Sequence, residues 1–317
     1  MSTLENNNIP INGSMFADIS IPLDVAQQTA VAAWAVKTAM VVDSVRGRVA
    51  TNRFYRKEEC VAEHFHVRRT ADNVGIIAPN WNVAPGAPQP VIRRSRDTGE
   101  RELVMMRWGI VPWFAKTEDE FKKLSTINAK SDRLLDSKLW RDPFAKRRCL
   151  VPASGLYEWP KPGHAISPTY EPEPAVEEAG PGDLFDTASK PAKKKKASKP
   201  IKRVFAITLT EPGPFAFAGI WDSWKRQDGT RLETFAIVTT EPNELVATIH
   251  DRLALILHPR DYDRWLGIPE SGDPRPPLNL LHPYDASRMK MTPANPAVGN
   301  WRNNGPEMLN GPDTSHG

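Results

Sequence analysis

The chain is poor in cysteine and contains no long apolar run. Cys60 and Cys149 are the only cysteines among its 317 residues, too few for the disulfide framework of a small secreted protein. No segment approaches the roughly 18 consecutive apolar residues of a membrane span. The first residues also lack the basic and apolar regions of a secretory signal. These absences predict a protein of the reducing cytoplasm without a membrane anchor.

Several signatures of cofactor and metal chemistry are missing as well. The chain has no GxGxxG, P-loop or GxSxG pattern, so nucleotide-binding and α/β-hydrolase interpretations find no support. His64 and His66 are two residues apart on a predicted helix and face different sides, with no cysteine or carboxylate set at ligand spacing. The sequence therefore predicts neither a cofactor nor a metal site.

The composition is that of a globular chain with an uneven charge distribution. Apolar residues make up 40% and charged residues 25% of a length sufficient for one large domain or two ordinary ones. Residues 43–159 carry 22 basic and 15 acidic side chains, a net charge of +7, against +4 for the whole chain. This concentration favours a polyanionic partner, although solvated surface charge would give the same pattern.

Short strands dominate the predicted secondary structure. A hairpin is expected over 89–112, with its turn at Asp97, Thr98 and Gly99, and two further strands around Ser154 and Gly155. The remaining elements are strands at 202–209, 215–225, 231–240 and 253–257 and short helices at 56–67, 241–250 and 261–267. Without βαβ alternation or repeats, this order predicts an α+β fold around a curved, barrel-like mixed sheet with short flanking helices.

One domain, interrupted by an insertion, accounts for the organisation of the chain. We assign residues 1–42 to an N-terminal extension, 43–304 to the domain and 305–317 to a C-terminal tail. Residues 161–202 are rich in Pro, Glu and Lys, cannot bury enough apolar surface to order themselves, and are predicted to be a disordered insertion. The tract Lys193 to Lys196 within it either contacts nucleic acid or is a solvated tether.

Two ionisable residues are candidates for proton transfer. Glu158 ends a predicted strand between Tyr157 and Trp159, and burial among aromatic rings would disfavour its charged form and make it a usable proton donor. An edge-strand glutamate facing water is the alternative. His250 ends a predicted helix beside Asp251, whose carboxylate could orient the imidazole, unless the histidine is only a helix cap.

Two further residues bear on the same chemistry. Asn128 lies between Ile127 and Ala129, the setting of a buried hydrogen-bonding group. Cys149 occupies an apolar strand and is a candidate thiol nucleophile for His250, although free cysteine in such a strand is more often inert core. None of these residues is specific by itself.

Seven segments become specific in combination, because they follow one another in a fixed order and spacing. From about Arg46 to about Asn304 they resemble the SRAP family, the SOS-response-associated peptidases that process abasic sites in DNA. The segments are "NVAPG" (82–86), "MRWGIVPWFAK" (106–116), "INAKSD" (127–132), "RRCLVPASGLYEW" (147–159), "FAFAGIWDSW" (215–224), "TTEPNELVATIHDRLALIL" (239–257) and "AVGN" (297–300).

The resemblance implies a single α+β domain that binds single-stranded DNA in a basic groove and acts on the ring-opened aldehyde of an abasic site. It implies a monomer that needs no cofactor or metal and associates with the nucleoid when bound to DNA. By motif position, Asn128 matches the family's positioning asparagine, Glu158 its acid/base for sugar opening, and His250 its histidine for Schiff-base chemistry and ring opening.

The DNA-binding surface is implied in the same way. Arg48 matches the arginine of the family's start motif, Lys130 stands in place of an arginine, and Pro85 belongs to the "NVAPG" segment. Trp113 and Phe114 occupy the position of an aromatic wedge. Aromatic rings stack on exposed bases at about 1–3 kcal/mol each, and Lys and Arg neutralise phosphates without reading sequence.

Arg46 is the departure from the family pattern. The resemblance places a reactive cysteine in a Met-Cys-Gly-Arg start, where its amine and thiol close a thiazolidine with the aldehyde, whereas this chain has Arg46 before Gly47 and Arg48. The chain as given is therefore not expected to form the thiazolidine. The leading hypothesis is an abasic-site DNA-binding protein that lacks the crosslinking nucleophile. The alternatives are a non-catalytic single-strand-binding module and a peptidase using Cys149 and His250.

Overall fold

The structure is a computed structural model. It describes residues 61–74, 79–118, 120, 126–170, 201–268 and 275–311. The predicted extension, Arg46, Arg48, Cys60, the lysine tract and the end of the predicted tail lie outside the described residues.

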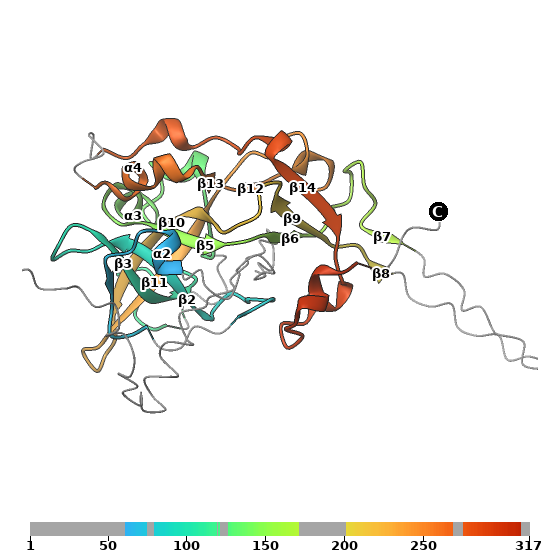
Figure 1. The fold of residues 1–317 in the computed structure, drawn as a ribbon. Coiled ribbons are helices and arrows are strands. Elements are labelled where there is room, and N and C mark those ends of the chain that lie inside the picture. The colour runs from blue at the N-terminus through green and yellow to red at the C-terminus, as the bar shows by residue number, and fades with distance from the viewer. Residues whose placement is uncertain are drawn as a thin grey trace, which may run out of the picture.

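A mixed sheet that closes on itself forms the centre of the fold (Figure 1). Along its main path the strands follow the order β1, β3, β2, β5, β10, β11, β12, while β4 pairs with β11 and β13 with β10. Because β3 pairs with β2 at one edge and with β11 at the other, the path returns to its start. The predicted barrel-like sheet is therefore confirmed. Its strands are β1 (Arg69–Thr70), β2 (Pro88–Arg94), β3 (Arg101–Trp108), β4 (Asn128–Lys130), β5 (Arg148–Ala153), β10 (Phe215–Lys225), β11 (Arg231–Thr240), β12 (Leu253–Ala254) and β13 (Ile256–Leu257).

A smaller sheet continues from the main one. It has the order β14, β9, β6 and lies to the right of the main sheet in Figure 1. The chain passes from β5 into β6 through Gly155, where an added Cβ would lie 3.0 Å from Thr208 Cγ2 and 3.1 Å from the Ile207 carbonyl oxygen. Glycine therefore avoids a tight contact where the chain changes sheets. The strands are β6 (Leu156–Glu158), β9 (Phe205–Leu209) and β14 (Met289–Pro293), and a separate pair consists of β7 (Thr169–Tyr170) and β8 (Ile201–Lys202).

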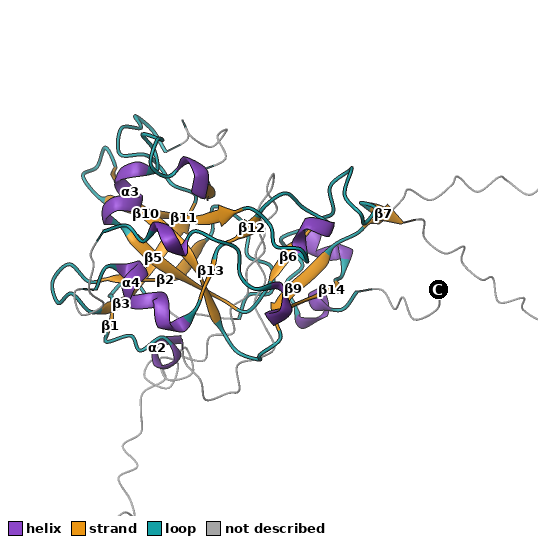
Figure 2. Cartoon of the chain, turned by 90° about the horizontal axis from the view of Figure 1, so that it is seen from above, coloured by secondary structure: helices purple, strands orange, loops and turns teal. Residues whose placement is uncertain are grey.

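Short helices lie against the main sheet rather than between parallel strands (Figure 2). Helix α4 ends as the sequence predicts, because Gly267 adopts a left-handed φ of 70° and its N–H bonds to the Arg264 carbonyl at 3.2 Å. The α-helices are α2 (Val61–His64), α3 (Arg141–Lys146) and α4 (Tyr262–Leu266). The 3-10 helices are η1 (Ser131–Arg133), η2 (Val246–Thr248), η3 (Pro259–Asp261), η5 (Leu278–Leu280), η6 (Ala286–Arg288), η7 (Pro296–Gly299) and η8 (Pro306–Leu309).

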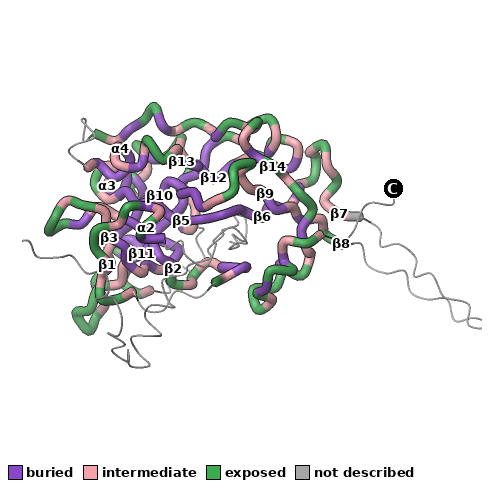
Figure 3. Tube along the Cα trace, in the orientation of Figure 1, coloured by how far each residue is buried: buried purple, intermediate pink, exposed green. Residues whose placement is uncertain are grey.

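The central strands are buried on both faces (Figure 3). Cys149 and Val151 of β5 pack into one hydrophobic cluster with Trp108 and Phe235, whereas Leu150 faces a second cluster. That second cluster includes Trp265 of α4. Burial on both faces explains why these strands read as continuous apolar runs instead of alternating patterns.

Three predicted elements differ from the structure. The strand expected over 202–209 is divided into β8, which ends at Lys202, and β9, which begins at Phe205. The helix expected over 241–250 is reduced to η2, because the Asn243 side chain accepts from the Val246 N–H at 3.0 Å and donates to the Tyr284 carbonyl at 2.8 Å. The strand expected over 253–257 is divided at Leu255 into β12, which pairs with β11, and β13, which pairs with β10. The chain thus crosses from one neighbouring strand to the other within five residues.

Part of the predicted insertion makes contacts with the domain. The Lys161 N–H donates to the Ile249 carbonyl at 2.9 Å, and the Ile166 N–H donates to the Thr248 carbonyl at 3.2 Å. Strands β7 and β8 pair across the point where the chain leaves and returns. Residues 171–200 lie outside the described residues.

We predict that residues 171–200 can be replaced by an Asn-Gly turn. Because Tyr170 and Ile201 are already partners in β7 and β8, a two-residue turn closes the hairpin without moving either strand. The melting temperature should change by less than about 3 °C. A control deletion of 161–200 should lower it, because the contacts of Lys161 and Ile166 are lost. A fall above about 5 °C for the first variant, roughly 1–2 kcal/mol, would contradict the prediction.

Candidate functional site

Glu158 and His250 form a buried acid–imidazole pair. Their closest charged atoms, Glu158 Oε1 and His250 Nε2, are 3.6 Å apart, and the two residues are 2% and 1% exposed. Glu158 ends β6, and His250 lies two residues after η2. The alternatives of a glutamate facing water and of a histidine that only caps a helix are therefore wrong. Their separation is longer than a direct hydrogen bond, as is common for acid–base groups of a site without substrate.

The backbone of Arg252 sets the tautomer of His250. The Arg252 N–H donates to His250 Nδ1 at 3.0 Å, so the neutral ring carries its proton on Nε2, the atom nearest Glu158. The Arg252 carbonyl lies 3.1 Å from the same Nδ1 and can accept from it when the ring is doubly protonated. One residue thus provides a partner for each protonation state, and the ring can gain or lose a proton in place.

Asp251 does not play the orienting role expected from its place in the sequence. Its carboxylate bonds to Lys161 Nζ at 2.6 Å and to His164 Nε2 at 2.8 Å. These hydrogen bonds, that of Lys161 first, hold the pKa of Asp251 below its ordinary value. Asp251 therefore fastens the segment after β6 to the turn that carries His250.

Asn128 is the first residue of β4, and its side-chain oxygen is a hydrogen-bond acceptor. It pairs in parallel register with Ile237 of β11, and the indole of Trp108 donates to the carbonyl of the preceding Ile127 at 3.0 Å. Its side-chain Oδ1 is buried and has no hydrogen-bond partner among the residues that the structure describes. Because an unsatisfied buried acceptor costs about 1–3 kcal/mol, this atom is a natural partner for a donor on a bound molecule.

The segments of all three residues meet at the end of β11. β4 pairs with β11 at Ile237, and β12 pairs with it at Thr239. An ion pair of 3.2 Å between Asp132 and Arg252 joins the segment of Asn128 to the turn of His250. The Lys161–Ile249 hydrogen bond brings the exit of β6 to the same turn.

The residues that fasten these segments were missed by the sequence analysis. Trp108 supports Ile127, Asp132 pairs with Arg252, and Lys161 and His164 hold Asp251. Lys161 and Asp251 are 90 residues apart in the chain, and Asp132 and Arg252 are 120 apart. No local pattern could have found pairs at such separations.

A basic cavity adjoins Asn128. It has a volume of about 430 Å³. Lys130 is exposed and lies two residues after Asn128, so both side chains project from the same face of β4. The lining residues are Asn128, Lys130, Arg133, Asp136, Ser137 and Trp140.

Trp113 and Phe114 project from the loop that follows β3. They are 66% and 47% exposed, and their rings meet edge to face with centroids 5.6 Å apart. Both side chains therefore lie outside the hydrophobic core. Two exposed aromatic rings side by side suit stacking on bases.

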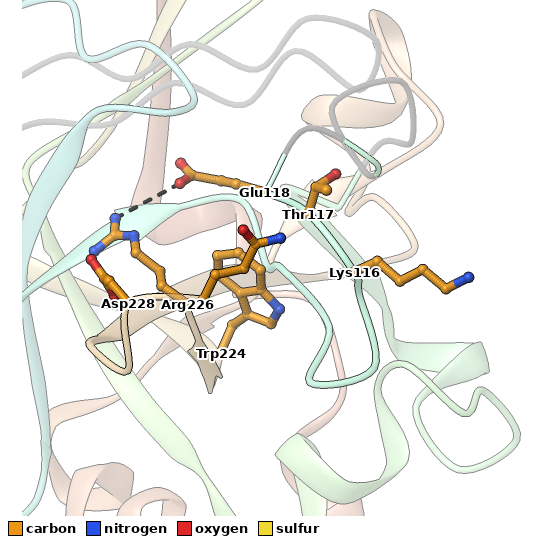
Figure 4. A pocket seen from close by; sticks show the side chains of 7 residues that line it. Lys116, Thr117, Glu118, Trp224, Arg226 and Asp228 are labelled. Carbon is orange, nitrogen blue, oxygen red and sulfur yellow. Dashed lines mark ion pairs between the residues drawn. The ribbon is translucent and has the colours of Figure 1, made fainter.

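The base of this loop is rigidly held (Figure 4). The indole of Trp224 donates to the Ala115 carbonyl at 2.8 Å, and Glu118 forms ion pairs with Arg107 and, at 3.7 Å, with Arg226. Glu118, Trp224 and Arg226 border a cavity of about 550 Å³. Trp224 and Glu118 thus fix the platform from which the exposed rings project.

Pro85 borders another cavity, and its motif also has a folding role. The cavity measures about 360 Å³ and is lined by Pro85, Trp108 and Ile127 among others. In the same motif, Asn82 Nδ2 donates to the carbonyls of Val298 and Asn300, each at 2.9 Å. The "NVAPG" and "AVGN" segments therefore meet in space.

Cys149 is unsuited to nucleophilic chemistry. It is 0% exposed within β5, where its neighbours across the sheet are Arg93 and Gly219. Burial raises the pKa of its thiol well above the ordinary value, so the reactive thiolate is disfavoured. The structure contradicts the alternative of a peptidase using Cys149 and His250.

The described residues contain neither a metal-ligating cluster nor a membrane-spanning helix. No group of three or more His, Cys, Asp or Glu side chains there has an arrangement that could hold a metal ion. Within the same part of the chain, no helix is long and apolar enough to cross a membrane.

Comparisons with known proteins agree with one another. The family model described as SOS response associated peptidase (SRAP) matches residues 46–301. The abasic site processing protein YoqW of Bacillus subtilis (strain 168) is 31% identical over 231 residues, 73% of this chain and 85% of YoqW. The abasic site processing protein HMCES of Mus musculus is 29% identical over 244 residues, 73% of this chain and 64% of HMCES.

Solved structures share the fold. A protein of Bacteroides thetaiotaomicron superposes with a TM-score of 0.53 at 22% identity, covering 74% of this chain and 85% of its own. A protein of Bordetella bronchiseptica superposes with a TM-score of 0.54 at 18% identity, covering 82% and 99%.

We predict different stability effects for Trp224, which contacts the base of the aromatic loop from β10, and for Trp113, which projects from the loop. Trp224→Ala should lower the free energy of unfolding by about 3–5 kcal/mol, because a buried ring and its bond to Ala115 are lost. For a domain of this size the melting temperature should fall by about 6–20 °C. Trp113→Ala, the matched control, should leave it nearly unchanged. Equal melting curves for the two variants would contradict the roles of base and exposed ring.

Proposed function

This chain belongs to the SRAP family, and from that membership we propose that it binds single-stranded DNA at abasic sites in the DNA damage response. YoqW and HMCES both carry the name abasic site processing protein. The observation that carries the proposal is the buried pair of Glu158 and His250, 3.6 Å apart. Such a pair can move protons on a sugar that enters the site.

The proposed chemistry is the opening of the abasic sugar. The closed form is a hemiacetal, and opening it breaks the bond between C1′ and the ring oxygen while the C1′ hydroxyl becomes an aldehyde. The Glu158 carboxylate takes the hydroxyl proton, and the doubly protonated His250 gives its Nε2 proton to the ring oxygen. The proton left on Nδ1 donates to the Arg252 carbonyl, 3.1 Å away, until the Glu158 carboxyl returns its proton to Nε2 and restores the starting pair. Protons are conserved overall, and no cofactor takes part.

Asn128 would position the substrate. Its Oδ1 is an unpaired buried acceptor among the described residues, and a hydroxyl of the opened sugar can donate to it. Removing a hydrogen-bond partner from a buried acceptor is costly, so a bound hydroxyl is favoured at this point. Asn128 is thus a binding group, whereas Glu158 and His250 transfer protons.

The exposed surface around the pocket supports strand binding. Lys130 borders the cavity beside Asn128 and would neutralise a phosphate. Trp113 and Phe114 are exposed and would stack on bases. None of these contacts reads base identity, so we propose binding with little sequence preference.

We further propose that the chain does not crosslink to the lesion. Arg46 stands at the position of the family's cysteine, and a guanidinium keeps its proton at neutral pH and offers no nucleophilic lone pair. Of the two cysteines, Cys149 is buried and Cys60 does not lie at the motif position. A single-strand-binding protein without any chemistry is the second candidate, favoured by the same Arg46.

A restored nucleophile tests the proposal. A chain that begins Met-Cys-Gly, with Arg46→Cys before Gly47 and everything earlier deleted, should lose its initiator methionine. It then exposes an amine and a thiol with pKa values of about 8 and 8.5, held against the aldehyde at high effective concentration. We expect heat-stable crosslinks to abasic single-stranded DNA on a denaturing gel, formed more slowly by Glu158→Gln and His250→Ala versions.

The control begins Met-Ser-Gly and should not crosslink, nor should the unmodified chain. Crosslinking by the unmodified chain would mean that another residue is the nucleophile. A folded, DNA-binding Arg46→Cys chain that forms no crosslink would favour the second candidate.

A further inference from the structure

A basic cavity lies at the end of β5 away from Glu158. It has a volume of about 650 Å³, and the rim of Trp221 forms part of its wall. It opens between the β2–β3 turn, the end of α3 and the end of α4. We call it the arginine cavity. Its basic lining residues are Arg94, Arg96, Lys146, Arg147 and Arg148.

Two of these cations have partners within the fold. Arg147 forms an ion pair of 3.3 Å with Asp222. Arg148 is buried and donates to the carbonyls of Phe144 and Ala145 at the end of α3, each at 2.9 Å. Both side chains therefore serve to hold α3 on the sheet, and a bound anion is not needed to explain them.

The other three cations have no carboxylate partner. Arg94 donates to the Gly267 carbonyl at 2.8 Å, Arg96 lies 5.1 Å from the centroid of the Trp221 ring, and Lys146 is exposed. None of them forms an ion pair with any residue that the structure describes. Asp97, the acidic lining residue, pairs with Arg69 at 3.5 Å. Basic side chains thus outnumber acidic ones around this cavity.

Helix α3 connects this cavity to the pocket beside Asn128. Trp140, immediately before α3, lines the Asn128 cavity, and Lys146, its last residue, lines the arginine cavity. Six helical residues span about 9 Å, the length of about three nucleotides in a stacked strand. Residues 128–148 carry seven basic and three acidic side chains. A nucleic-acid strand leaving the pocket along α3 would therefore follow positive charge to the arginine cavity.

We propose that the arginine cavity binds the phosphodiester backbone of the same DNA strand, about three nucleotides from the abasic site. This inference rests on the proposed function. Arg96 and Lys146 contact phosphate oxygens, and Arg94, fixed by Gly267, contributes its remaining N–H groups. Because phosphates are the same on every strand, the cavity adds affinity and fixes the direction of the strand without reading its sequence.

The test compares strand lengths. The full chain is titrated with a 21-nucleotide and a 5-nucleotide single strand, each with a central abasic site, at several salt concentrations. The variant is Arg96→Glu with Lys146→Glu. The control is Lys202→Glu with Arg260→Glu, the same charge change at exposed residues outside both cavities. Melting curves check that both variants are folded.

We expect the variant to bind the 21-nucleotide strand at least about 10-fold more weakly, with a salt slope reduced by at least about 1.4 for two lost contacts. It should bind the 5-nucleotide strand as the unmodified chain does, and the control should match the unmodified chain on both strands. Equal losses on the two strands, or no loss on the longer one, would overturn the proposal.

Two outcomes separate this inference from its premise. If the unmodified chain binds neither strand, the proposed function fails, and the strand-binding cavity fails with it. If it binds both strands but the variant binds them equally well, only the arginine cavity is wrong. Pyrophosphate binding that depends on Arg96 and Lys146, without a loss on the longer strand, would assign the cavity to a free anion and overturn its occupation by DNA.

Discussion

The parallel pairing of β3 with β11 is the constraint on which the rest of the structure depends. Through the register of Arg107 with Thr234 and of Trp108 with Phe235 it closes the sheet, and it fixes where the chain leaves β3. The indole of Trp108 can then hold the Ile127 carbonyl, which sets the start of β4. The same closure fixes the exit of the loop that carries the exposed aromatic rings. Loss of the β3–β11 pairing would therefore separate the cavity beside Asn128 from the exposed rings of Trp113 and Phe114.

The two ends of the path from β5 through β6 differ in how far their charged side chains are buried. At its far end Glu158 and His250 are buried together, where a low local dielectric strengthens their interaction and favours proton exchange between them. At its near end Arg96 and Lys146 of the arginine cavity remain in contact with solvent, where each contributes little stability to the fold. Residues that transfer protons need burial, whereas residues that hold phosphates must stay accessible.

The sequence predicts the local features of this protein better than its long-range ones. Gly99 and Gly267 have φ values of 78° and 70°, and the turn and the helix end expected at them are confirmed. The crossing at Leu255 was not foreseen, because an apolar run does not say which strand each residue will join. The aromatic neighbours of Glu158 left its burial open, because an edge-strand glutamate that faces water can have the same local sequence; the structure buries it. Its partner His250 was found as a candidate but paired with the wrong carboxylate, because adjacency in sequence favoured Asp251 over a residue 92 positions away.

The central proposal is that Glu158 and His250 open an abasic sugar in a chain that has Arg46 before Gly47 and Arg48. Its most direct test is the rate at which an aminooxy probe captures the aldehyde of abasic single-stranded DNA, measured at a probe concentration where sugar opening limits the rate. With the unmodified chain in excess the rate should rise about 10²-fold or more, the usual contribution of a positioned acid–base pair, and Glu158→Gln should lose most of that rise while still binding the strand. Equal capture rates with the unmodified chain, with Glu158→Gln and without protein would contradict the account.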